Sequence, residues 1–117
     1  MKFMILLSQD ADAWEREPQS EKDRVYNEHM KVVGHLQAEK KLVDSRRLRP
    51  SAEAKTVRMR NGKHVVVDGP FCETKEQIGG FYLIECDSME EALEWAKKMP
   101  HFGDLRYAGI EVRPLWE

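Results

Sequence analysis

Two segments of the chain are apolar on both faces of an extended strand. Residues 2–8 and 80–86 carry apolar side chains at successive positions. In the segment 2–8, Phe3 is the first apolar side chain on one face of the strand and Met4 is the first on the other. A sheet containing such strands needs cover on both sides, since soluble monomers rarely expose a large apolar patch.

Two other segments repeat their apolar residues at helical spacing. The first helix is expected to begin at Ser20, with Asp23 three residues later in the arrangement of a capping box, and to end near Lys40. The second is expected to follow Ser88, with Glu91 completing its capping box, and to end before the next proline. Between Ser8 and Ser20 we expect only a polar loop, which contains Pro18.

The dipeptide Asn61-Gly62 predicts a β-hairpin, because Asn and Gly tolerate the two positive φ angles of a type I′ turn. Its strands are residues 56–60 and 63–67. Two cross-strand pairs are expected in this hairpin: Val57 with Val66, and Met59 with His64.

Weaker alternation predicts further strands at residues 42–49 and 106–114. Without the inserted hairpin the order is strand, helix, strand, strand, helix, strand, so the expected class is α+β with a ferredoxin-like split βαβ fold. Two helices cover only one face of a four-stranded sheet. We therefore expect two copies to pair their open faces in a dimeric α/β barrel; the alternative is that the hairpin folds over this face.

Length and charge narrow the class of protein. The 117 residues fit one domain. A net charge of -2 gives the protein no positive electrostatic field that would attract nucleic acid or an anionic membrane. No apolar run has the length of a membrane span or the form of a signal peptide, which predicts a cytoplasmic protein. Cys72 and Cys86 lack the spacing of a zinc site or disulfide framework. We expect no metal and no cofactor.

Residues 68–80 form the most specific motif of the chain, and they read DGPFCETKEQIGG. The motif resembles the signature of the DGPF, or YCII-related, family, and residues 111–114 resemble the closing strand of that family. Cys72 stands where the family more often has a small residue. The resemblance implies a bacterial protein with a ferredoxin-like fold and a dimeric α/β barrel, in a family of mostly unassigned activity. Related proteins are suspected enzymes with a paired His and Asp in a cleft, and related domains are fused to sigma factors.

The charged residues of this motif are candidates for a site at the mouth of a cleft. We rank Asp68 first, as an acid or base, and place Glu73, Lys75 and Glu76 beside it as substrate-binding or supporting groups. The structural alternative is that Asp68 only ties an Asp-Gly turn and that the other charges belong to a solvated loop.

Among the histidines, His29 and His101 are the candidates to pair with Asp68. His29 lies beside the apolar stripe of the first helix, where a histidine is more often a hydrogen-bonded core residue than a base. Glu111 and Arg113 share one face of the last strand, where Arg113 either pairs across a dimer or holds an anionic ligand.

Two functions follow from these residues. The first is an enzyme that acts without cofactor on a small organic molecule by Asp/His acid–base chemistry in a dimer-interface cleft. The second is a non-catalytic dimeric domain that binds a small ligand or a protein, with a regulatory role.

Overall fold

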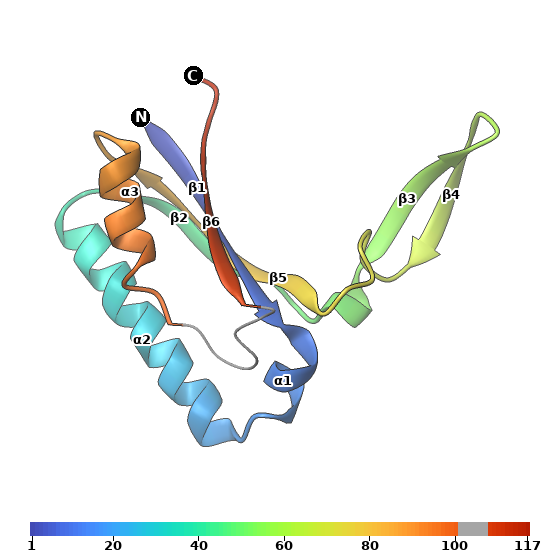
Figure 1. Cartoon of the computed structure of the whole chain (residues 1–117), viewed down its shortest axis with the longest axis horizontal. Helices are drawn as coiled ribbons and strands as arrows, with labels where there is room; N and C mark the ends of the chain where they lie inside the picture. The colour runs from blue at the N-terminus through green and yellow to red at the C-terminus, as the bar shows by residue number, and fades with distance from the viewer. Residues whose placement is uncertain (101–107) are drawn as a thin grey trace.

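The computed structural model of the chain describes residues 1–100 and 108–117. A four-stranded antiparallel sheet has the order β2-β5-β1-β6, and β3 pairs with β4 in a separate two-stranded sheet (Figure 1). The predicted α+β class is confirmed. The elements in chain order are β1 (Lys2–Asp10), α1 (Ala11–Arg16), α2 (Gln19–Ala38), β2 (Leu42–Arg47), the 3-10 turn η1 (Ser51–Glu53), β3 (Lys55–Arg60), β4 (Lys63–Asp68), β5 (Glu76–Glu85), α3 (Met89–Ala96) and β6 (Gly109–Pro114).

The core lies between one face of the large sheet and the helices α2 and α3, which lie on the same side of it (Figure 1). Phe3 and Ile5 of β1 and Ile84 of β5 are fully buried against these helices. Leu36 of α2 and Trp95 of α3 pack against them. Burying each of these side chains stabilises the fold by about 1.5–3 kcal/mol.

The opposite face of the sheet is apolar and only half-buried. In the strand register, Met4 lies opposite Leu83 and Leu6 lies opposite Phe81, and these four side chains alternate with the core residues. No described helix packs on this face. The open face is therefore the surface that a second sheet would cover.

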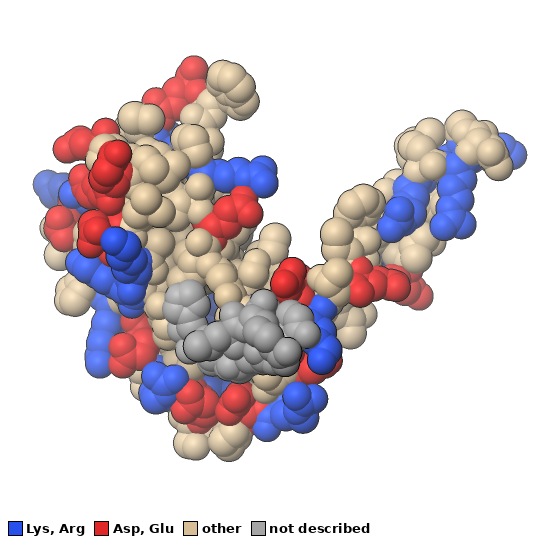
Figure 2. Space-filling view, in the orientation of Figure 1, with Lys and Arg blue, Asp and Glu red and all other residues tan. Residues whose placement is uncertain are grey.

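The hairpin of β3 and β4, here called the arm, does not cover the open face. It stands clear of the body in Figures 1 and 2, and Val57 and Val66 are each 63% exposed. The alternative in which the hairpin folds over the sheet is therefore wrong. Its turn is confirmed, since Asn61 and Gly62 have φ angles of 50° and 77°. The two expected cross-strand pairs are confirmed by the register.

Two helix starts differ from the sequence prediction. Residues 11–16 form a helix, capped by the Asp10 carboxylate, which accepts a hydrogen bond from the Ala13 amide at 3.1 Å. The next helix begins at Gln19 instead of at a Ser20 cap, because the carbonyl of Pro18 already accepts the first helical hydrogen bonds. The Ser88 cap is confirmed, since its hydroxyl accepts from the Glu91 amide at 3.2 Å.

Gly80 allows β2 and β5 to approach closely. A Cβ atom at this position would lie 2.8 Å from the carbonyl oxygen of Arg46, which is backbone and does not give way. The resulting register sets Ser45 opposite Tyr82, so Ser45 and Arg47 share the helix side of the sheet while Arg46 lies on the open face. The expected strand at 42–49 ends two residues earlier, at Arg47.

No helix among the described residues is both long and apolar enough to cross a membrane.

Candidate functional site

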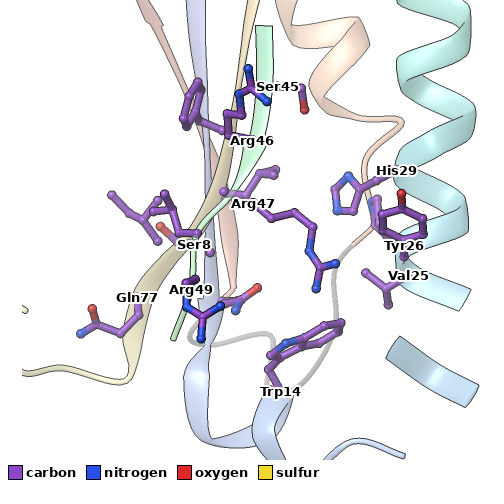
Figure 3. A pocket seen from close by; sticks show the side chains of 18 of the residues that line it. Ser8, Trp14, Val25, Tyr26, His29, Ser45, Arg46, Arg47, Arg49 and Gln77 are labelled. Carbon is purple, nitrogen blue, oxygen red and sulfur yellow. The ribbon is translucent and has the colours of Figure 1, made fainter. Parts of the chain in front are cut away.

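An open cleft of about 1450 Å³ lies on the helix side of the sheet, between α1, α2 and the edge strand β2 (Figure 3). Aromatic and ionisable side chains from three elements line it. Trp14 comes from α1, Tyr26 and His29 come from α2, and Arg47 comes from β2. The cleft thus gathers residues that are distant in sequence.

His29 is held at the wall of the cleft by a tyrosine on the sheet. Its Nδ1 atom lies 2.8 Å from the hydroxyl oxygen of Tyr82, and that hydroxyl also lies 3.3 Å from the His29 carbonyl oxygen, to which it can donate. Tyr82 is 2% exposed, and burial raises its pKa to about 12, with a small opposing effect from the Ser45 hydroxyl. The phenol therefore stays protonated at neutral pH and fixes the orientation of the imidazole.

The environment of His29 favours the neutral imidazole. Burial lowers its pKa below the ordinary value of 6.5, and the positive charge of Arg47 lowers it further. In the tautomer with the proton on Nδ1, Tyr82 accepts that N–H and Nε2 keeps a free lone pair. Among the described residues, the ring makes no other hydrogen bond, so Nε2 is available to a bound molecule.

The lowered pKa of His29 predicts a pH-dependent stability. Because the unfolded chain binds this proton at a higher pH than the folded chain, the His29 contribution is complete above about pH 6.5 and is lost as the pH falls through the folded pKa. Urea unfolding from about pH 7.5 to about pH 5.5 should therefore show a steeper loss of stability for wild type than for His29→Gln. Equal slopes for the two proteins would contradict the assignment.

Asp68 lies outside this cleft. It ends β4 at the base of the arm, its side chain is 86% exposed, and its carboxylate accepts a hydrogen bond from the Lys55 ammonium at 2.6 Å. The carboxylate therefore binds a side chain of the neighbouring strand and not the backbone of its turn. Within one chain, the structure does not bring Asp68 and His29 together.

The other motif candidates also lie away from the cleft. Glu73 and Lys75 are exposed in the loop before β5, and Glu76 is the exposed first residue of that strand. Arg113 lies on β6, where its guanidinium binds Glu111 of the same strand at 2.5 Å. His101 lies outside the described residues.

The DGPF segment itself secures the base of the arm. The Gly69 amide donates to the Ala54 carbonyl at 2.7 Å, and the Thr56 hydroxyl donates to the Gly69 carbonyl at 2.8 Å. Arg58 donates to the Phe71 carbonyl at 3.2 Å, and its guanidinium lies 4.7 Å from the centre of the Phe71 ring. These contacts give the motif a structural role.

The sequence interpretation missed three residues of the cleft. Tyr82 looked like one more apolar strand residue, and Trp14 lay in a segment expected to be a loop. Arg47 belongs to the run Arg46-Arg47-Leu48-Arg49, a local concentration of cations that is visible in the sequence. Among residues 1–100 and 108–117, no cluster of three or more His, Cys, Asp or Glu side chains has the geometry of a metal site.

Comparison with known proteins agrees with the resemblance of the motif. The family model of the YCII-related domain matches residues 1–117. The chain is also 38% identical over 118 residues to Uncharacterized protein R00369 of Rhizobium meliloti (strain 1021), an alignment that covers 98% of this chain and 92% of that protein. The protein therefore belongs to the family of YCII-related domains.

Proposed function

We propose that this protein binds a small organic molecule in the helix-side cleft and transfers a proton to or from it through His29. The observation that carries the proposal is the arrangement of His29, which is neutral, held by Tyr82 and exposed to the cleft on its other nitrogen. A general base needs these three properties near neutral pH.

The chemistry uses side chains only. Nε2 of the imidazole takes a proton from the bound molecule, and the Tyr82 oxygen accepts the Nδ1–H bond of the imidazolium that forms. The imidazolium then returns a proton to another atom of the molecule or to the original one, either the proton it took or one exchanged with water. This is the reaction class of isomerases, and it needs no oxidant or group carrier.

We also propose the ferredoxin-like arrangement and its dimer. The two β-α-β units are β1-α2-β2 and β5-α3-β6, and the arm is inserted before β5. In the strand order β2-β5-β1-β6, the first strands of the two units, β1 and β5, lie side by side at the centre of the sheet. Support for the dimer comes from the open face, where Leu6 and Phe81 lie side by side. Two such faces packed together would form the barrel, and Asp68 could then act only at a site that the second copy helps to build.

The alternative function is ligand binding without catalysis. It is favoured by the position of Asp68, because Asp68 and His29, the candidate His/Asp pair among the described residues, are not brought together within one chain. In this case the cleft would hold a small molecule as a signal or cargo.

Deuterium exchange separates the two functions without knowledge of the product. A thermal-shift screen of small organic acids, amides and ketones first identifies molecules that stabilise the protein. Each is then incubated with enzyme in D₂O, and NMR measures the replacement of its acidic C–H by deuterium. We expect wild type to catalyse this exchange and His29→Gln to slow it by about 100-fold or more.

The matched control is His35→Gln, since His35 lies on the same helix but is exposed and does not line the cleft. This variant should exchange like wild type. Binding without exchange in wild type would overturn the catalytic proposal and favour the alternative.

A further inference from the structure

Three arginines follow one another closely at the edge of the sheet, and they differ in how their charges are balanced. Arg46 lies 3.2 Å from the Asp44 carboxylate, and Arg49 lies 2.9 Å from the Glu53 carboxylate. Arg47 has no carboxylate within ion-pair distance among the described residues. Arg47, the one without a counter-charge among the described residues, faces the helix side of the sheet.

The Arg47 side chain extends from β2 across the cleft toward α2 (Figure 3). Its guanidinium lies 5.5 Å from the centre of the Tyr26 ring, and Trp14 lies at the α1 end of the same space. Its charge reaches the imidazole of His29, whose pKa it lowers. Among the described residues no carboxylate forms an ion pair with Arg47, so its positive charge acts on the imidazole of His29.

Carboxylates line the cleft, but the structure directs several of them elsewhere. Asp44 and Glu53 are held by the two flanking arginines, and Asp23 accepts a hydrogen bond from Gln19 at 2.8 Å. Lys22, a second cation at the cleft, lies 5.7 Å from the centre of the Trp14 ring. Arg47 is thus the cation of this wall that is both directed across the cleft and close to His29.

We propose that the ligand of this cleft is a planar carboxylate, and that Arg47 binds its carboxylate group. This inference rests on the proposed function and names the chemical class of the bound molecule. A guanidinium offers two parallel N–H donors that match the two oxygens of a carboxylate. The aromatic side chains of Tyr26 and Trp14 line the same cleft and suit a flat, apolar ligand body.

The arrangement also couples binding to the state of the base. A carboxylate on Arg47 cancels the positive charge that lowers the pKa of His29, so ligand binding raises that pKa. An imidazole that is neutral in the empty cleft thereby becomes a stronger base when the ligand is present. Removing the Arg47 charge by mutation has the same direction of effect on the empty protein.

The test compares benzoate with benzamide, which share a ring and differ in charge, by NMR titration of the ¹⁵N-labelled full-length protein. In wild type, benzoate should shift the amide resonances of cleft residues and raise the pKa of His29, and benzamide should bind at least about tenfold more weakly. Arg47→Met should weaken benzoate binding by about tenfold or more and raise the His29 pKa in the empty protein.

Arg60→Met is the matched control, because Arg60 is exposed on the arm and does not line the cleft. It should bind benzoate like wild type. If benzoate fails to bind at the cleft, or if Arg47→Met binds it like wild type, the carboxylate inference is overturned while the deuterium-exchange test of His29 stands on its own. If exchange fails but benzoate binding depends on Arg47, the inference holds and the catalytic proposal falls.

Discussion

Leu6→Glu should convert the proposed dimer into a monomer. Leu6 lies on the open face beside Phe81, and two copies that pair these faces would bury a carboxylate from each chain in an apolar interface. The dissociation constant should rise by about 100-fold or more, since an unpaired buried charge costs several kcal/mol. Sedimentation velocity at micromolar concentration measures the change directly.

The control for this experiment is Val57→Glu. Val57 is 63% exposed on the arm, and a dimer built on the sheet leaves it unaffected. Loss of the dimer in Val57→Glu together with its retention in Leu6→Glu would move the interface from the sheet to the arm. A monomeric wild type would overturn the barrel.

Phe3→Ala should remove a large part of the stability of the fold. The side chain is fully buried between β1 and the helices, so truncation loses its burial and leaves a cavity, at a cost of about 3–5 kcal/mol. Small domains have total stabilities of about 5–15 kcal/mol, and the variant should therefore be only marginally folded. Urea unfolding at one fixed protein concentration measures the difference.

Val66→Ala serves as the comparison, because it removes apolar atoms from a side chain that is 63% exposed. It should change the free energy of unfolding by less than about 0.5 kcal/mol. A loss below about 1 kcal/mol in Phe3→Ala would contradict the placement of the core on this face.

Some of the parts of the fold that local sequence determines were predicted correctly. Asn61-Gly62 specifies its turn through its own φ angles, and the Ser88 hydroxyl caps its helix through the Glu91 amide, only three residues away. The helix of residues 11–16 was missed because it has no apolar periodicity and depends on the Asp10 cap. The strand alternation of β1 and β5 identified both the core face and the open face.

The candidate site was predicted only in part, because its contacts join residues that are far apart in the chain. His29 and Tyr82 are 53 residues apart, and no local pattern indicates that a phenol will lie beside this imidazole. The dense charges around Asp68 pointed to a site. In the structure its carboxylate is instead paired with Lys55 on the neighbouring strand of the hairpin. Arg47 is distinguished by the fact that Arg46 and Arg49 are paired with carboxylates. These pairs can be recognised only once the positions of Asp44 and Glu53 are known.

The separateness of the arm has a practical consequence. The two strands bond to each other, and neither forms part of the four-stranded sheet that carries Arg47 and Tyr82. Exposed hairpin tips tolerate added residues well, because no core contact depends on them. An affinity tag or a fluorescent label inserted between Asn61 and Gly62 would therefore report on the protein while leaving the sheet and its cleft intact.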